Sequence, residues 1–296
     1  MDIRQLRQFQ NLAHSLHFGR AAAASHVSPS ALSRSIRQLE GEVGATLFTR
    51  DNRSVELTSA GVAFLSYARE AVSQWEVVCH QLQVEAGELQ GEVSIYCSVT
   101  ASYSFLFELL NRFRREHPRI EIKLHTGDSE HAVQRVLAGE EDMAIGARPE
   151  HLHPRLAFKP IARSPLVFVA ANRAAAYASL AHHAPTAELW NDVPMILSES
   201  GLARDRVDRW FAQHDIQPRI YAQVGGNEAI VSMVSLGFGV GVVPRIVLDN
   251  SPLADTVSVL PVQPELAAYE VGLLVLNKKL RSPLISAFWS QSRTAD

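Results

Sequence analysis

The chain from Ser28 to Glu40, SPSALSRSIRQLE, predicts an amphipathic helix with a sharply defined start. Ser28 suits the N-cap and Pro29 suits the first helical position, as helix starts prefer. At about 100° per residue, the apolar residues fall on one narrow stripe: Leu32, Ile36, Leu39 and Val43. Hydroxyls and arginines centre on the opposite side: Ser30, Ser33, Arg34 and Arg37. One face of this helix must be core, and the other is free to contact a partner.

Two shorter helices precede this segment and complete a helix-turn-helix. Apolar residues at 3-4-3 spacing predict the first helix: Leu6, Phe9, Ala13 and Leu16. An Ala-rich helix follows at Arg20–Ala24, and a turn at His26–Val27 leads into the third helix. Small serines allow close approach to a DNA major groove, and Arg can bond guanine twice or hold a phosphate. The alternative is an ordinary solvated face with incidental arginines.

The segment after the third helix predicts a wing. Residues 47–58, LFTRDNRSVELT, divide into two short strands around a polar turn at residues 51–54. This hairpin places Arg50 and Arg53 near a phosphate backbone. Residues 1–39 carry a net charge of +4 and the remainder −7, so the basic groups gather in the same part of the chain. A basic head on an acidic body favours a nucleic-acid partner.

The run from Phe18 to Gly61 resembles the winged helix-turn-helix of LysR-type transcriptional regulators. The spacing, the apolar positions, the Leu-Ser-Arg of the third helix and the Leu-Thr-x-Ala-Gly after the wing all coincide. The resemblance implies sequence-specific binding of a double-stranded DNA operator. Carried over by position, it implies base contacts from Ser30, Ser33 and Arg34, and phosphate contacts from three further arginines: Arg37, Arg50 and Arg53.

A long connector helix is predicted from an N-cap at Thr58 to about Ala86. Its apolar residues step as a heptad seam: Leu65, Ala68, Val72, Trp75, Cys79, Leu82, Ala86 and Leu89. Such a seam needs a partner, and a second copy of the same helix supplies one, with Leu65, Val72, Trp75 and Leu82 as candidate dimerisation residues. Packing of the helix on the C-terminal part of its own chain is the alternative.

From Gly91 onward, strands alternate with helices, which predicts parallel α/β architecture in two lobes. We expect a winged helix-turn-helix domain at 1–58, a linker helix at 59–90 and an effector domain at 91–296. The first lobe takes 91–161 plus 267–296, and the second takes 162–266. Two lobes of this kind resemble periplasmic solute-binding proteins and the effector domain of the LysR-type family.

Ligands of open α/β sheets bind beyond the carboxyl ends of the strands, where helix N-termini favour anions. Four polar strand-to-helix turns lie there in this sequence: 98–100, 126–128, 198–201 and 225–227. Ordinary helix capping is the alternative for each turn. The candidate ligands of a small carboxylate effector are Ser98, Thr100, Thr126, Asp128, Arg148, Ser198, Gly226 and Asn227.

Several chemistries lack a specific pattern in this sequence. The Gly-rich run at 237–241 follows a helix and enters a strand, the reverse of a dinucleotide loop. The His residues lack metal-ligand spacing, and no nucleophile elbow or Walker loop is present, so we expect no catalytic residue, metal or cofactor. Two cysteines, a charged N-terminus and no long apolar run favour a cytoplasmic protein without a membrane partner.

Four stretches of the C-terminal part resemble a branch of the LysR-type family that activates isoleucine–valine biosynthesis: residues 95–104, 113–128, 220–244 and 284–289. That resemblance implies activation of the acetohydroxy acid isomeroreductase gene in response to acetolactate or acetohydroxybutyrate. It also implies a homodimer or homotetramer that can contact RNA polymerase. The alternatives are a LysR-type regulator of another small organic acid, or an α/β enzyme or solute-binding protein with a helical head.

Overall fold

The computed structural model describes residues 1–50, 54–85, 89–172, 177, 180 and 185–292. The chain divides into two compact units, Met1–Glu88 and Leu89–Asp296. The linker helix predicted at 59–90 lies for the most part in the first unit.

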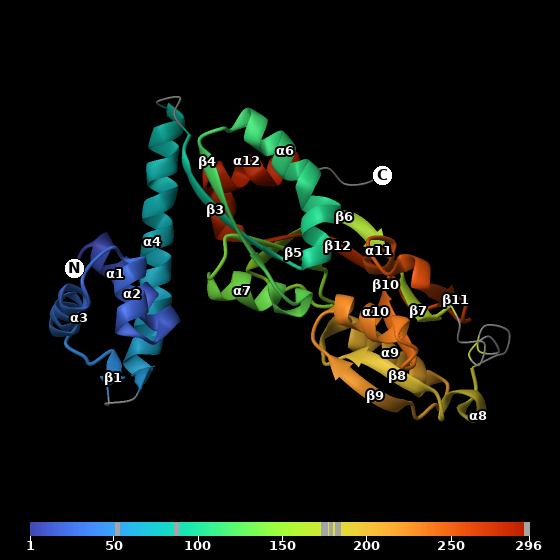
Figure 1. Ribbon diagram of the computed structural model, residues 1–296. Helices are drawn as coiled ribbons and strands as arrows, with labels where there is room; N and C mark the ends of the chain where they lie inside the picture. The colour runs from blue at the N-terminus through green and yellow to red at the C-terminus, as the bar shows by residue number, and fades with distance from the viewer. Residues whose placement is uncertain (51–53, 86–88, 173–176, 178–179, 181–184, 293–296) are drawn as a thin grey trace. The chain divides into compact units, whose positions relative to one another are not determined.

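The first unit is a three-helix head followed by a two-stranded wing and one long helix (Figure 1). Its elements are α1 (Ile3–Ser15), α2 (Phe18–Ala24), α3 (Pro29–Val43), β1 (Phe48–Arg50), β2 (Val55–Leu57) and α4 (Ser59–Glu85). The two strands are antiparallel, with Phe48 opposite Leu57. The winged helix-turn-helix expected from the sequence is therefore confirmed.

Both ends of α3 follow from local chemistry. The Ser28 hydroxyl accepts a hydrogen bond from the Ala31 amide at 3.2 Å, and Pro29 occupies the first turn. Gly44 ends the helix in the left-handed conformation, with φ of 75°, and its N–H donates to the Glu40 carbonyl oxygen. A left-handed C-cap is the position that glycine tolerates best.

The core of the first unit contains the expected apolar residues with two exceptions. Phe9, Leu32, Ile36 and Leu39 are fully buried. Val43, expected on the buried stripe, is 38% exposed because it is the last residue of α3. Leu16, expected on the stripe of α1, is 44% exposed because it forms the left-handed C-cap after that helix. Leu12 is buried on α1 instead.

Helix α4 starts as the sequence predicts. The Thr58 hydroxyl accepts a hydrogen bond from the Gly61 amide at 2.9 Å, so Thr58 is the N-cap. The predicted heptad seam is divided between two environments. Ala68 and Val72 are buried in the core of the first unit, and Leu65 packs against that core. Trp75 is 50% exposed and Leu82 is 60% exposed.

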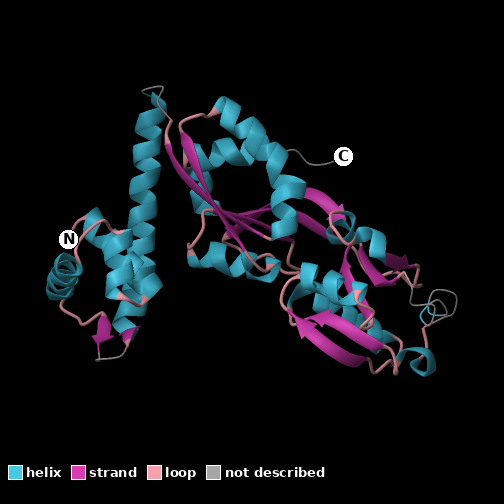
Figure 2. Ribbon diagram, in the orientation of Figure 1, coloured by secondary structure: helices cyan, strands magenta, loops and turns pink. Residues whose placement is uncertain are grey.

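The second unit contains two five-stranded sheets (Figure 2). The first sheet has the order β4 (Ile120–Thr126), β3 (Gly91–Cys97), β5 (Met143–Ala147), β12 (Tyr269–Leu276) and β6 (Leu156–Ser164). The second has the order β11 (Val257–Leu260), β7 (Leu166–Ala171), β10 (Val240–Pro244), β8 (Pro194–Ser198) and β9 (Arg219–Val224). We call the parts built on these sheets lobe 1 and lobe 2.

The sheets are mixed, which corrects the expectation of parallel sheets. Strand β3 is parallel to β4 and β5, but β12 is antiparallel to both β5 and β6. In lobe 2, β8 is parallel to β9 and β10, whereas β7 is antiparallel to β10 and β11. Strand β6 runs to Ser164, three residues beyond the expected lobe boundary at 161, and leads directly into β7 of the other sheet.

Helices follow the strands of both lobes. Lobe 1 contains α5 (Val99–Ala101), the π-helical η1 (Ser102–Leu106), α6 (Phe107–Glu116), the 3-10 helix η2 (Ser129–His131), α7 (Ala132–Ala138), the 3-10 helix η5 (Asn277–Arg281) and α12 (Pro283–Gln291). Lobe 2 contains α8 (Ala187–Trp190), α9 (Gly201–Gln213), α10 (Asn227–Ser235), α11 (Arg245–Asp249) and the 3-10 helix η4 (Ala254–Thr256). The two-lobed α/β fold is confirmed.

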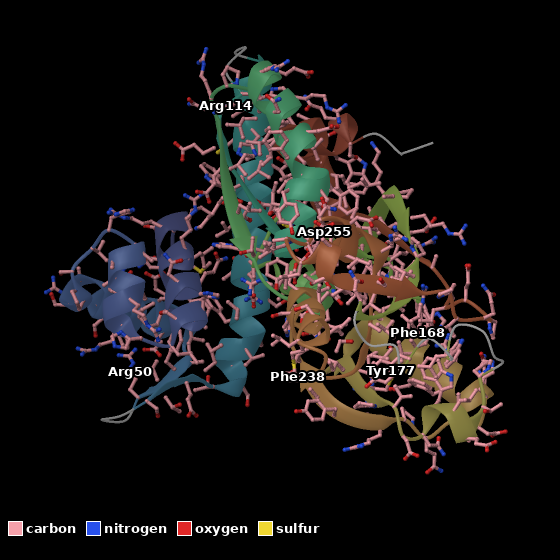
Figure 3. The ribbon with its side chains drawn as sticks, turned by 45° about the vertical axis from the view of Figure 1, so that its right-hand side comes forward. Arg50, Arg114, Phe168, Tyr177, Phe238 and Asp255 are labelled. Carbon is pink, nitrogen blue, oxygen red and sulfur yellow. The ribbon has the colours of Figure 1, made fainter. Side chains whose placement is uncertain are left out.

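One apolar cluster runs through both lobes. It includes Leu106, Phe113 and Phe288 of lobe 1 and an aromatic group of lobe 2 around Phe168, which Figure 3 labels. The Phe168 ring lies 5.1 Å from the Trp190 ring and 5.0 Å from the Trp210 ring, measured between centroids. Such tilted and edge-to-face contacts add to the stabilisation from burial. This continuous core packs the two lobes together where the chain crosses between them.

Candidate DNA-binding surface and ligand cleft

The outward face of α3 carries the groups expected to contact DNA. Ser30, Arg34 and Arg37 are exposed, and Ser33 is half-buried. Among the residues that the structure describes, neither Arg34 nor Arg37 has an ion-pair partner or a side-chain hydrogen bond. Because Leu32, Ile36 and Leu39 hold the opposite face in the core, both guanidinium groups are directed away from it. This face can donate hydrogen bonds to base edges or phosphates.

Arg50, expected to face phosphate, is instead paired within the chain. Its guanidinium donates to Glu40 at 2.8 Å and lies over the Phe18 ring at 5.2 Å (Arg50 is labelled in Figure 3). An ion pair of this kind holds the side chain against the protein. Arg53, the other arginine of the predicted wing, lies outside the described residues.

Glu40 connects α3 to the start of the wing. One carboxylate oxygen accepts from the amides of Leu47 at 2.9 Å and Phe48 at 3.2 Å, and the other accepts from Arg50. The same helix that presents Arg34 therefore also fixes the position of β1. This role could not be predicted from the sequence, because a lone Glu near the end of a helix has the same pattern as a solvated residue.

We expect Glu40→Ala to lower the free energy of unfolding of the first unit by about 1–2 kcal/mol, because two backbone amides and Arg50 lose their acceptor. Glu40→Gln keeps one acceptor oxygen and should lose less. Chemical denaturation followed by tryptophan fluorescence and circular dichroism measures both. Equal stability of Glu40→Ala and the unmodified chain would contradict the connecting role.

The candidate dimerisation residues fall into two pairs. Leu65 and Val72 pack within the first unit, so their expected role in a subunit interface is not supported by their position. Trp75 and Leu82 remain exposed, and Val78 adds a third exposed apolar side chain on the same helix. The C-terminal half of α4 is thus an apolar surface that a second helix could cover.

The four polar turns of the second unit converge on adjoining cavities between the lobes. One cavity is lined by Asp128, Ser198, Gly226 and Asn227. A second, which shares Asn227, is lined by Ser98 and Thr100. A third is lined by Thr126, Asp128 and Gly226. Seven of the eight candidate effector residues therefore lie at one cleft.

Arg148, the eighth candidate, lies elsewhere. Its guanidinium donates to Glu270 at 3.1 Å and lies over the Phe158 ring at 5.8 Å. It lines none of these three cavities. This position does not support the prediction that Arg148 pairs with an effector carboxylate, because antiparallel pairing of β5 with β12 brings Glu270 next to Arg148.

We call the cavity lined by Ser98 and Thr100 the inner part of the cleft and the cavity lined by Ser198 the outer part; the inner part is mainly apolar, and the outer part carries more polar groups. Inner side chains are contributed by both lobes: Phe105, Ile145, Ile246, Val247 and Val271. Ser198, Ser200 and Asn227 lie in the outer part. Small-molecule sites combine an apolar lining with a few placed polar groups. This arrangement suits a small molecule with a polar end and a short alkyl end.

Tyr269 borders both parts of the cleft and was not anticipated from the sequence. Burial raises the pKa of its hydroxyl, although the Arg206 guanidinium, 5.4 Å from the ring centroid, lowers it. The phenol therefore stays protonated at neutral pH and can donate a hydrogen bond. Cys97, just before the Ser98 turn, is buried, which raises the pKa of its thiol to about 11 and leaves it unreactive.

Carboxylates of the chain itself bridge the two lobes at the cleft. Asp128 of lobe 1 accepts from the Gly226 amide of lobe 2 at 2.9 Å. Glu228 of lobe 2 accepts from the Thr100 amide at 3.1 Å and from its hydroxyl at 2.6 Å. Ser200 of lobe 2 donates to the Glu130 carboxylate at 2.7 Å. Neither Glu130 nor Glu228 was predicted as a cleft residue from the sequence.

The part of the chain that the structure describes contains neither a candidate metal cluster nor a candidate membrane-spanning helix. No group of three or more His, Cys, Asp or Glu side chains there could hold a metal ion. None of the helices there combines the length and the apolar character needed to cross a bilayer.

Two family models match the chain. The model described as "Bacterial regulatory helix-turn-helix protein, lysR family" matches residues 3–62. The model described as "LysR substrate binding domain" matches residues 86–296. The first match contains α1 to β2, and the second contains both lobes and the cleft.

Individual proteins agree with the family models. The chain is 44% identical over 293 residues to the HTH-type transcriptional activator IlvY of Salmonella typhimurium, with 98% of each chain covered. A full-length OxyR variant from Pseudomonas aeruginosa superposes with a TM-score of 0.73 at 24% identity, covering 99% of this chain and 95% of that one. Full-length CbnR complexed with its target DNA superposes with a TM-score of 0.63 at 23% identity, covering 99% of both. The chain therefore belongs to the LysR family of bacterial regulatory helix-turn-helix proteins.

Proposed function

We propose that this LysR-family regulator activates transcription of the acetohydroxy acid isomeroreductase gene in isoleucine–valine biosynthesis. The observation that carries the regulatory role is the outward face of α3, where Arg34 and Arg37 are exposed beside Ser30 and lack partners among the described residues. The similarity to the transcriptional activator IlvY over 98% of both chains supports the choice of target gene.

The effector in this proposal is acetolactate or acetohydroxybutyrate. Each carries a carboxylate, a keto group, a hydroxyl and a short alkyl group. The outer cleft offers hydroxyls and amides of Ser198, Ser200 and Asn227, and the inner cleft adds Ser98 and Thr100 to a small apolar lining. A ligand shifts a conformational equilibrium only when it binds one arrangement more tightly. Contacts to both lobes give this effector a means of preferring one arrangement.

Two measurements on the full-length protein test the proposal. Titration calorimetry with 2-acetolactate should give a saturable heat, and no heat at millimolar concentration would reject this effector. Fluorescence anisotropy with labelled DNA from upstream of the isomeroreductase gene should show tighter binding than to a scrambled fragment. Heat from a different small acid alone would identify a regulator of another pathway, and no DNA retention at low salt would favour a solute-binding protein.

The proposal includes self-association through the exposed half of α4. We expect Leu82→Glu to raise the dimer dissociation constant by about tenfold or more, since it buries an unpaired charge in an apolar interface. Analytical ultracentrifugation over a concentration series measures the change. Val62→Glu is the matched control, because Val62 is equally exposed but lies on a different face of α4. Equal behaviour of the two variants would place the interface elsewhere.

A further inference from the structure

Among the described residues, carboxylates of the chain itself accept the hydrogen bonds that tie the polar turns of one lobe to those of the other. Thr100 is 2% exposed, yet both its amide and its hydroxyl donate to a single oxygen of Glu228. The Gly226 amide donates to Asp128. These donors belong to the turns from which a carboxylate ligand would be held. Internal carboxylates therefore occupy positions that an effector carboxylate requires.

The two acceptors differ in how firmly they are held. Asp128 accepts from Gly226 with one oxygen and from the Glu130 amide with the other, at 3.2 Å. Its carbonyl oxygen also accepts from the Tyr96 hydroxyl at 2.9 Å. Glu228 is an exposed side chain of α10, and both of its hydrogen bonds to described residues are donated by Thr100. Glu228 can leave by rotation of its own side chain, whereas Asp128 cannot move without its loop.

We propose that Glu228 acts as a carboxylate clasp: it competes with the effector for Thr100, and the effector's carboxylate displaces it on binding. The clasp rests on the proposed function, because Glu228 would regulate effector binding in the same cleft. Displacement breaks a bond between α10 of lobe 2 and Thr100 of lobe 1 while the contacts of Asp128 and Glu130 remain. Binding is thereby coupled to the arrangement of the lobes.

The clasp predicts a change in effector affinity opposite to the change expected for a direct ligand contact. When a site is available only part of the time, the apparent dissociation constant rises by the inverse of the available fraction. Hydrogen bonds to a charged group are among the stronger ones. Removal of the clasp in Glu228→Ala should therefore tighten binding of an anionic effector by about tenfold or more. A residue that itself holds the effector would give weaker binding when removed.

Charge alone also changes anion affinity, and Glu199 provides the matched control. Glu199 lines the same cavity as Glu228, and the Glu199 side chain has no hydrogen bond to another described residue. Glu199→Ala removes one negative charge from the cleft without freeing Thr100. We expect it to tighten binding by no more than about threefold, since exposed charges interact weakly through water.

The experiment measures hydrogen exchange of the peptide containing Thr100 and calorimetric binding of 2-acetolactate, both on the full-length protein. Glu228→Ala should exchange at least about tenfold faster at this peptide without ligand, and Glu199→Ala should match the unmodified chain. Saturation with 2-acetolactate should restore protection in Glu228→Ala, and the affinity should rise as stated above.

Four results separate failure of the clasp from failure of the proposed function. Unchanged exchange at Thr100 in Glu228→Ala would overturn the clasp, whichever ligand the cleft binds. Weaker binding of 2-acetolactate by Glu228→Ala, or equal tightening by Glu199→Ala, would overturn the competition. Absence of binding by every form, including the unmodified chain, would reject the effector, and the exchange rates alone then decide whether the clasp holds Thr100.

Discussion

Arg34→Ala is expected to lower the affinity for a specific operator at least about thirtyfold. Loss of an arginine that bonds a guanine costs about 1–3 kcal/mol, and a two-fold symmetric dimer presents the residue once in each half-site, which doubles that cost. Arg34 is available for this contact, since it is exposed on α3 and lacks an ion-pair partner among the described residues. Fluorescence anisotropy with the specific fragment and a scrambled fragment of equal length measures the loss.

Arg37→Ala is the matched control for Arg34→Ala. Both residues are exposed on the same helix, three positions apart, and each substitution removes one positive charge. A phosphate contact carries no sequence information, so Arg37→Ala should weaken binding to both fragments similarly and reduce the salt dependence. Arg34→Ala should affect the specific fragment far more than the scrambled one. Equal losses on the two fragments for Arg34→Ala would show that this residue does not contact bases.

The head of the protein is predictable from its sequence because local signals agree there. Ser28, Pro29 and Thr58 cap or start helices where capping preferences place them. The apolar period places Leu32, Ile36 and Leu39 in the core. Where the period fails, at Leu16 and Val43, the residue sits at a helix end, and the backbone has already turned away from the stripe. Periodicity identifies a face but does not locate its last residue.

Strand β6 shows what the sequence could not reveal in the second unit. It contains Pro160, which ordinarily argues against a strand. The structure accommodates this proline because β6 is the edge of its sheet and its pairing with β12 shifts register there, between Val271 and Gly272. Missing such a strand also hides its antiparallel pairing with β12, because strand–helix alternation indicates parallel neighbours.

The location of the cleft could be predicted from the sequence, but its charge pairs and carboxylate contacts could not. Seven polar turn residues meet there because parallel strands end at one edge of each sheet. The pairing of Arg148 with Glu270 and of Glu228 with Thr100 depends on contacts across 122 and 128 residues. Charge partners at such separation leave no local pattern in a single sequence. Glu130 and Glu228 could therefore not be placed at the cleft until the fold was known.

Gly61→Ala is expected to destabilise the first unit by about 3 kcal/mol and to abolish DNA binding at temperatures where the unmodified chain is active. A Cβ at position 61 would lie 2.1 Å from the Leu47 carbonyl oxygen, which is backbone. That oxygen cannot move freely, because it accepts from the Thr58 amide at 3.0 Å. In a helix, alanine is favoured over glycine by about 1 kcal/mol, but overpacking against backbone costs more than this. Steric overlap therefore outweighs helix propensity, and the substitution is destabilising.

The corresponding drop in the melting temperature is about 12–24 °C for a unit of this size. Calorimetry of the full-length chain measures it, with the transition of the first unit identified by its upward shift when DNA is added. Gly41→Ala is the control, because Gly41 lies within α3 and a Cβ there would meet nothing within 4 Å. Gly41→Ala should raise the free energy of unfolding by about 0.5–1 kcal/mol through helix propensity alone. If Gly61→Ala were stabilising as well, the wing would not be fixed against the start of α4, and Arg34 would be presented by a less rigid head than these contacts indicate.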